Sequence, residues 1–553
     1  MWALFAFSGE KTVTLANLPR SFAHPVRAIA LIVTLAVLIL TLPGGAQAQV
    51  TAFRQAVAES AARDTNLATF YRGRDFEGIW TGGDSAAAGR RNALLTALAD
   101  AGAHGLPVAR YNPDQLMAQL RAAATPAQQG AAEVAMSQAF LHYARDVQTG
   151  ILTPSKVVPL IVREVPLRSP LGTLQAFIQS NPAAFLRSLP PSSPEYARLM
   201  REKLRMEGLL AQGGYGPTVQ AATLAPGASG QAVVDLRNRL ILMGFLDRTA
   251  TQTYDASIQA AVQRFQQSMG LSVDGSAGGE TMKEINVPLD RRMQSVIVAM
   301  ERERWMNRPR GQRHIWVNLT DFTAAIVDND RVTFSTRSVI GATESDRQSP
   351  EFSDVMEYMV INPSWYVPRS IVVNEYLPQL QSNSGAVSHL DVTDRSGNVI
   401  PRGSVNASKY TAKTFPYSMR QGPSERNALG LVKFLFPNKY NIYLHDTPSK
   451  NLFSRESRAF SHGCIRLNDP FDFAYALLAR QESDPKAVFQ ARLNTGSESR
   501  ITLKEPVPVH IVYRTAFTNV TGQLQFRRDI YGRDAAIWNA LAREGVAVRA
   551  LQG

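Results

Sequence analysis

The chain has 553 residues, and its 59 lysines and arginines against 46 aspartates and glutamates give a formal net charge of +13. This length exceeds what one hydrophobic core normally organises, so roughly three domains are expected. The basic residues are spread along the sequence rather than gathered in a tail. The single cysteine excludes a disulfide framework within the chain.

The N-terminal segment 1–48 has the features of an export signal. Residues 28–42 are almost wholly apolar, Arg20 and Arg27 precede them, and an Ala-Gln-Ala tripeptide follows. A short apolar run behind basic residues, ending in a small-residue cleavage site, is typical of a secretory signal peptide. The run is short for a bilayer span, which needs ~20 apolar residues; an uncleaved membrane anchor is the alternative. We therefore expect a periplasmic protein.

Export also limits which anionic polymers this basic protein can bind. Nucleic acid is not an expected partner outside the cytoplasm, whereas a carboxylate-rich cell wall attracts a basic protein. The sequence thus favours association with an anionic wall polymer.

Apolar residues recur at helical spacing from about residue 50 to residue 217. Leu94, Leu98 and Ala101 form one such series, and residues 134–143 form another. No residue in this region belongs to a recognisable chemical motif, so we interpret 50–217 as a helical scaffold domain.

A compact unit is predicted over residues 224–286. Ser229 is the expected N-cap of a first helix that stops at Gly244, and Asp255 caps a second helix that stops at Gly270. Further pattern residues are Leu236, Arg264-Phe265-Gln266 and the run Gly270–Gly275. Together they resemble the small three-helix peptidoglycan-binding module. A spacer with the same fold is the alternative.

Over residues 291–553 the periodicity changes from helical to alternating. Short apolar strands separated by turn residues are expected at 314–319, 324–327, 332–334, 356–361 and 431–436. A long, polar, turn-rich segment at about 368–419 interrupts them, and such segments inside compact domains are usually functional lids or disordered. We expect a mostly β catalytic domain with a capping insertion, and an α+β fold for the whole chain.

The lone cysteine lies in the run Ser461–Leu467, which reads Ser-His-Gly-Cys-Ile-Arg-Leu. Exported proteins normally pair their cysteines, so an unpaired thiol beside histidine indicates a nucleophile. An inert small hydrophobe is the alternative. Gly463 lets a carbonyl approach closely, and the backbone N–H groups of Gly463 and Cys464 are candidates for stabilising an oxyanion.

Two histidines are candidate bases for the thiol. His462 is two residues from Cys464, so an extended segment would place both side chains on one side. His445 lies on a separate predicted strand at 440–445, whose alternation puts it on the same face as Tyr443. An imidazole within hydrogen-bond reach would favour the thiolate, and spacing alone does not choose between the two.

Asp446 and Arg466 flank these groups. Asp446 is a candidate for orienting an imidazole, but adjacent strand residues point to opposite sides, so a backbone carbonyl is an equal candidate. Arg466 suits a clamp on a substrate carboxylate, because a guanidinium binds carboxylates in bidentate fashion. A structural ion pair is the alternative role for Arg466.

The segments Tyr443–Pro448 and Ser461–Leu467 together resemble the signature of L,D-transpeptidases with a YkuD-type catalytic domain. Further matches, to the large YcbB-like subgroup, are Ile361–Pro368, Gln421-Gly422-Pro423, Asn427–Gly430 and Phe471-Asp472. The resemblance implies a cell-wall cross-linking enzyme that contributes to cell shape. Its substrates would be peptidoglycan stem peptides, with a tetrapeptide as donor and an amine as acceptor.

In that family's chemistry, Cys464 would attack the carbonyl after the third residue of the stem, release D-alanine and form a thioester. A neighbouring stem's amine would then accept the acyl group in a 3→3 cross-link. The resemblance implies that His445 is the acid and base and that no cofactor or metal takes part. It also implies that four further residues surround the substrate and the thiol: Tyr443, Ser461, His462 and Gly463. A hydrolase with the same acyl-enzyme, such as an L,D-carboxypeptidase, and a catalytically silent wall-binding protein are the alternatives.

Overall fold

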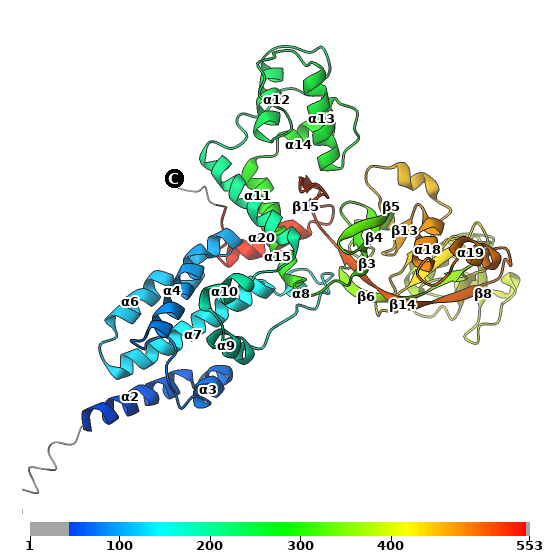
Figure 1. Cartoon of the computed structure of the whole chain (residues 1–553). Coiled ribbons are helices and arrows are strands. Elements are labelled where there is room, and N and C mark those ends of the chain that lie inside the picture. Colours follow the sequence, from blue (N-terminus) through cyan, green and yellow to red (C-terminus); the bar gives the residue numbers. More distant parts are fainter. Residues whose placement is uncertain (1–43, 549–553) are drawn as a thin grey trace, which may run out of the picture.

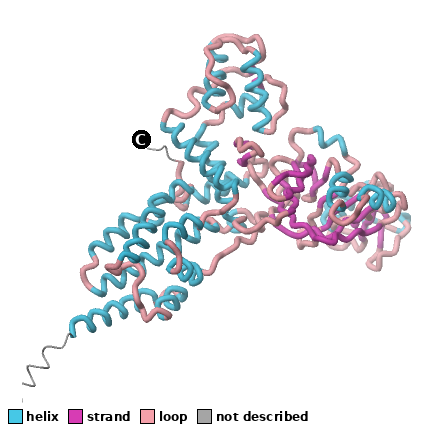
Figure 2. The backbone as a smooth tube through the Cα atoms, viewed as in Figure 1, coloured by secondary structure: helices cyan, strands magenta, loops and turns pink. Residues whose placement is uncertain are grey.

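The computed structural model describes residues 44–548, which form an elongated helical lobe, a small helical module and a β lobe (Figure 1). The predicted export signal lies outside the described residues, except that helix α2 (Gly44–Ala61) begins within its last residues. No helix among residues 44–548 is both long and apolar enough to cross a membrane. Figure 2 shows most strands gathered in one lobe, which also carries several helices, while the rest of the chain is mainly helical, as expected for an α+β protein.

The helical lobe consists of successive short and medium helices. They are α2, α3 (Thr65–Arg72), α4 (Ser85–Ala99), η2 (Asp100–His104), α5 (Val108–Tyr111), α6 (Pro113–Ala122), α7 (Pro126–Thr149), α8 (Pro154–Val157), α9 (Pro170–Ile178), α10 (Pro182–Ser188) and α11 (Pro194–Ala211). Several begin with proline, whose missing N–H costs nothing at a helix start. The Trp80 and Phe177 rings stack in the shared core with centroids 5.3 Å apart.

Two helices from outside the predicted scaffold also belong to this lobe. Helix α15 (Leu289–Trp305) packs against α11, and α20 (Arg533–Arg543) packs against α15. Met293 of α15 and Ile537 of α20 are fully buried in the helical core. The first and last helices of the predicted catalytic domain, 291–553, therefore bury their apolar faces in the helical lobe.

The small module contains β1 (Thr223–Leu224), α12 (Gln231–Leu242), α13 (Ala256–Met269), β2 (Ala277–Gly278) and α14 (Gly279–Ile285). Asp255 caps α13 as predicted, accepting the N–H groups of Ser257 and Ile258. The predicted cap at Ser229 is wrong, because α12 starts one residue later, after Gly230, without a side-chain cap. The Gln266 side chain joins α13 to the following turn, since it donates to Asp274 and accepts the Gly275 N–H.

The β lobe is built on one nine-stranded sheet. Its strands are β3 (Arg313–Asn318), β4 (Thr323–Asp328), β5 (Arg331–Gly341), β6 (Phe352–Ile361), β10 (Val432–Leu435), β11 (Leu444–His445), β12 (Ala459–Ser461), β13 (Ile465–Leu467) and β14 (Ser499–Val512). Their order is β12-β5-β13-β11-β10-β6-β14-β3-β4, and an additional β4–β5 pairing closes the sheet on itself. Helices α18 (Pro470–Leu478) and α19 (Pro485–Leu493) complete its core, with Phe473 against Phe434.

The strand predicted at 440–445 is shorter than expected. Only Leu444 and His445 pair as β11, and Asn441 adopts a positive φ of 54°. The Asn438 side chain holds this turn, accepting the N–H groups of Tyr440 (3.0 Å) and Ile442 (3.2 Å). Side-chain capping of this kind competes with the regular strand.

The insertion predicted at 368–419 forms a cap with a core of its own, together with flanking residues that extend it to 365–421. Its elements are β7 (Trp365–Tyr366), α16 (Arg369–Ile371), η3 (Val372–Tyr376), α17 (Leu377–Ser382), β8 (Asp391–Thr393), η4 (Arg402–Ser404), η5 (Ala407–Lys409) and β9 (Ser418–Gln421). Strands β7, β9 and β8 form a small sheet in that order. Val372, Phe415 and Met419 are almost completely buried in the cap core.

A hairpin of β15 (Ala516–Thr518) and β16 (Leu524–Phe526) leads from the sheet to α20. Phe526 lies in the core cluster of the helical lobe and module, and Arg292 stacks on its ring at 4.8 Å. The chain after β14 therefore returns from the β lobe to the helical lobe.

Candidate active site

Strands β11 and β13 bring the two sequence motifs together. They are parallel neighbours, with Leu444 opposite Ile465 and His445 opposite Arg466. Leu444 and Ile465 are fully buried in the sheet core. Because side chains alternate along a strand, His445 and Arg466 point to the other face, as does Cys464 just before β13.

His445 is held by a backbone carbonyl. Its Nδ1 lies 2.5 Å from the Asp446 carbonyl oxygen, so Nδ1 donates and Nε2 is left as the basic nitrogen. The Asp446 carboxylate serves another purpose, accepting the Leu431 N–H (2.9 Å) and the Lys450 ammonium (2.7 Å). Of the two orienting groups considered from sequence, the geometry selects the carbonyl.

Burial keeps the imidazole neutral. Burial, together with the cationic Arg466 and Lys433 and against hydrogen bonds to the Asp446 and Leu429 backbone, lowers the pKa of His445 to about 3. Lys433 lies directly opposite His445 in the β10–β11 pair. Sequence reasoning missed Lys433, although its alternation with Val432 and Phe434 was a signal for the site-facing side.

The Cys464 side chain is half-buried, and its Sγ donates to the Asn441 carbonyl at 3.4 Å. Burial raises the pKa of the thiol to about 11, although contacts with Tyr443 and the Arg466 charge oppose this. The Tyr443 ring also lies beside His445, with centroids 5.5 Å apart. At neutral pH the resting pair is therefore an uncharged thiol and an uncharged imidazole, not the thiolate expected from sequence.

The loop before the nucleophile is fixed by serine. Ser461 is buried, and its hydroxyl donates to the Cys464 carbonyl (2.5 Å) and accepts the Gly463 N–H (3.1 Å). Gly463 has a φ of 113°, a conformation open to glycine but strained for other residues. Since the Gly463 N–H is already bonded, it would have to leave Ser461 to serve an oxyanion, which departs from the expectation for this group.

His462 points away from the thiol and toward the cap. Its Nε2 lies 2.6 Å from Glu375 of η3, and the same carboxylate oxygen accepts Arg347 at 3.0 Å. The side chain is exposed. Of the two candidate bases, His445 shares the face of Cys464, whereas His462 links the nucleophile loop to the cap.

Arg466 lies beside the thiol without an acidic partner. Among residues 44–548 no carboxylate comes within 4.0 Å of it, and its Nε has no hydrogen-bond partner. Burial lowers its pKa, and the Cys464 side chain opposes this. A buried donor left unbonded is costly unless a ligand completes it. The structural ion pair considered for Arg466 is therefore not formed.

Comparison with known families assigns three regions of the chain. Residues 312–508 match the L,D-transpeptidase catalytic domain, residues 65–202 a scaffold domain, and residues 229–285 a domain described as "Putative peptidoglycan binding domain". The chain thus contains an L,D-transpeptidase catalytic domain combined with a scaffold domain and a peptidoglycan-binding domain. His445, Cys464 and Arg466 all lie inside the catalytic match.

Individual relatives carry the same description. A Haemophilus influenzae protein named "Putative L,D-transpeptidase" is 29% identical over 246 residues, covering 43% of this chain. The match spans 48% of that relative, about half its length. A solved L,D-transpeptidase from Xylanimonas cellulosilytica is 12% identical, and the match covers 54% of this chain and 100% of that one, with a TM-score of 0.16. A second, from Stackebrandtia nassauensis, is 14% identical, and the match covers 54% of this chain and 97% of that one, with a TM-score of 0.21.

Proposed function

We propose that this protein is a peptidoglycan L,D-transpeptidase that forms 3→3 cross-links through a thioester on Cys464. The observation that supports this most directly is the placement of His445 and Cys464 on one face of adjacent parallel strands, within the region that matches the catalytic domain. The unpaired Arg466 beside them suits the carboxylate of a stem peptide. The working location would be the periplasm, against the cell wall.

The neutral resting pair sets the order of proton movements. The Cys464 sulfur attacks the carbonyl carbon after the third stem residue while its proton passes to the basic nitrogen of His445. The C–N bond to D-alanine breaks, and His445 returns the proton to the leaving amine. In the second half, the acceptor amine attacks the thioester, gives a proton to His445, and the sulfur leaves and is reprotonated.

The cap influences whether an amine or water attacks the thioester. Its own core and its Glu375–His462 contact give it a defined position next to the nucleophile loop. A covered site that admits a stem amine and limits water favours transpeptidation over hydrolysis. An L,D-carboxypeptidase activity would arise from the same acyl-enzyme if water reached it first.

Muropeptide analysis tests the proposal. Purified peptidoglycan rich in tetrapeptide stems is incubated with the protein, digested with a muramidase and weighed by mass spectrometry. We expect dimers joined between third residues, together with released D-alanine, and neither product with Cys464→Ala. Tripeptide monomers without dimers would indicate a hydrolase, and unchanged muropeptides would contradict both activities.

A further inference from the structure

The peptide bond before the nucleophile is held by a serine outside the recognised motif. Ser349 is fully buried, and its hydroxyl donates to the Gly463 carbonyl at 2.6 Å while accepting the Gly341 N–H at 3.0 Å. The Gly463 carbonyl belongs to the peptide unit that also carries the Cys464 N–H. Its direction therefore sets the orientation of that unit.

Two serines thus fix the nucleophile from both sides. Ser461 holds the peptide after Cys464 through the Cys464 carbonyl, and Ser349 holds the peptide before it. Gly463 has a φ of 113°, and because glycine lacks a Cβ it can adopt many other backbone conformations. The two serine hydrogen bonds therefore hold it in this one. Gly341 allows the approach, since a Cβ there would lie 2.1 Å from the Arg347 carbonyl and 2.6 Å from the Ser349 nitrogen.

Ser349 is itself held by the C-terminal helix. Arg533, the first residue of α20, donates from Nη2 to the Ser349 carbonyl at 2.7 Å and from Nη1 to Glu351 at 3.0 Å. Its guanidinium stacks on the Tyr531 ring at 4.7 Å. Arg533 is almost completely buried, and it lies outside the 312–508 region that matches the catalytic domain.

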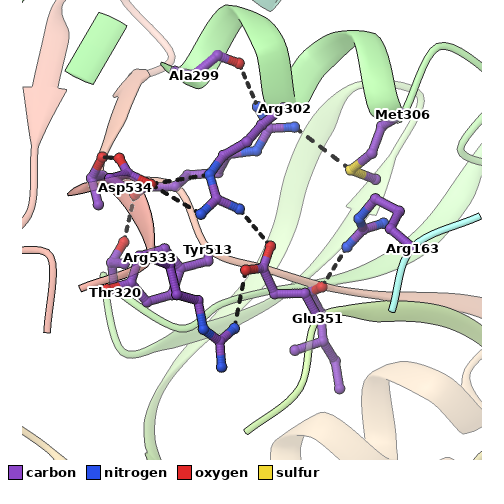
Figure 3. Close-up of polar contacts among 12 residues, drawn as sticks. Arg163, Ala299, Arg302, Met306, Thr320, Glu351, Tyr513, Arg533 and Asp534 are labelled. Carbon is purple, nitrogen blue, oxygen red and sulfur yellow. Dashed lines mark hydrogen bonds and ion pairs between the residues drawn. The ribbon is translucent and has the colours of Figure 1, made fainter. Parts of the chain in front are cut away.

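The same buried charges reach the helical lobe. Arg302 of α15 donates to the second Glu351 oxygen at 2.6 Å and pairs with Asp534 of α20 at 3.0 Å, so Glu351 lies between two arginines (Figure 3). Each of these four charged side chains is buried. If one partner of a buried ion pair moves away, the other is left as an uncompensated buried charge. These ion pairs therefore hold α15, α20 and Glu351 in fixed relative positions.

We propose that Ser349 is a positioning residue for the Cys464 nucleophile and that Arg533 acts through Ser349, which makes the C-terminal helix part of the active-site support. The role in catalysis rests on the proposed acyl-enzyme function. The role in holding the thiol does not, because it concerns the loop geometry alone.

The test compares Ser349→Ala with Ser338→Ala. Ser338 is a matched control, because it is fully buried in the same lobe and its hydroxyl has no partner among the described residues. We expect Ser349→Ala to lower the rate constant of Cys464 acylation by a tetrapeptide about tenfold, with the apparent affinity changed less than about twofold. Ser349→Thr, which keeps the hydroxyl, should recover most of the rate. Equal rates for Ser349→Ala and Ser338→Ala would overturn the proposal.

Arg533→Lys tests the second step through a double-mutant cycle. If Arg533 acts through Ser349, the lysine variant slows acylation alone but has little further effect in the Ser349→Ala protein. Independent effects that multiply in the double variant would contradict this part of the proposal. The lysine keeps a positive charge beside Glu351, which protects the fold.

A readout without substrate separates this proposal from the function. Iodoacetamide alkylation of Cys464 is followed across a pH series well below the unfolding temperature. A loosened loop exposes the thiol, so Ser349→Ala should shift the alkylation midpoint to lower pH, whereas Ser338→Ala should not. An unchanged midpoint would refute the positioning role. If the wild type resists acylation while Ser349→Ala still shows this shift, only the proposed acyl-enzyme is contradicted.

Discussion

His445 and Arg466 lie opposite each other in the parallel strands β11 and β13. Burial, and after it the Arg466 charge, lowers the pKa of His445 to about 3. The same guanidinium opposes the burial that raises the pKa of Cys464 to about 11. Arg466 therefore favours a neutral base and a more acidic thiol while its own Nε remains without a partner among the described residues.

Replacing Arg466 by methionine should affect both binding and ionisation. We expect the KM for a tetrapeptide donor to rise about tenfold, as for a lost charge-assisted hydrogen bond. Thiol alkylation at a fixed pH should slow, because the Cys464 pKa rises further. Steady-state kinetics and an iodoacetamide series measure the two effects. Arg455→Met, which removes an exposed arginine between β11 and β12, is the control, and identical behaviour of both variants would exclude the clamp.

The two histidines should differ sharply in their contribution to turnover. His445→Gln should reduce acylation about a thousandfold, within the range for loss of a general base. His462→Gln should cost about tenfold or less, because His462 contacts Glu375 of the cap rather than the thiol. Single-turnover acylation rates measure this. A larger loss in the His462 variant would reverse the assignment.

Buried neutral histidines should make the fold sensitive to acid. Burial lowers the pKa of His445 and of His510 to about 3, and that of His104 to about 4. An unfolded histidine has a pKa of about 6.5, so below that pH the unfolded state binds more protons and folding stability falls as the pH drops. Each buried histidine should cost about 1–2 kcal/mol of stability at pH 5.

The measurement is the denaturant midpoint between pH 7 and pH 4.5. Replacing His510, which contacts Ser353 (2.8 Å) and the Arg310 carbonyl (2.9 Å), by glutamine removes one titrating group. The variant is less stable at pH 7 but should lose less stability on acidification than the wild type. A steeper loss in the variant would contradict the linkage.

The small module should attach the protein to its substrate. When a binding module attaches the protein to an insoluble polymer, the local concentration of stem peptides around the active site rises. We expect the Cys464→Ala protein to pellet with purified peptidoglycan, and a folded variant lacking residues 224–286 to pellet markedly less. The positive charge adds an attraction that salt screens beyond about 8 Å. Equal pelleting of both proteins at physiological salt would reduce the module to a spacer.

Local patterns were sufficient to predict the parts of the site that depend on neighbouring residues. Alternation placed Tyr443 and His445 on one face, and their ring centroids lie 5.5 Å apart. The sequence predicted a close approach at Gly463, whereas the positive φ of this residue is known only from the structure. The peptidoglycan-binding module was also predictable, because Asp255 and Gly270 cap α13 by local rules.

Other features depend on contacts between distant parts of the chain. Ser349 meets Gly463 across more than a hundred residues, and Arg533 meets Ser349 from the far end of the sequence. The resting protonation of Cys464 follows from burial in the folded β lobe, which spacing cannot report. The cap core, with Phe415 against the surrounding helices, was likewise hidden in a polar segment.

The most direct test of the account is intact-protein mass spectrometry after brief incubation with a tetrapeptide donor. The wild type should gain the mass of the tripeptide acyl group, with D-alanine released, and digestion should locate the adduct on Cys464. The Cys464→Ala protein, whose unfolding midpoint should remain close to that of the wild type, should gain no mass. An adduct on the alanine variant, or tetrapeptide turnover by it, would contradict the assignment of Cys464 as the nucleophile.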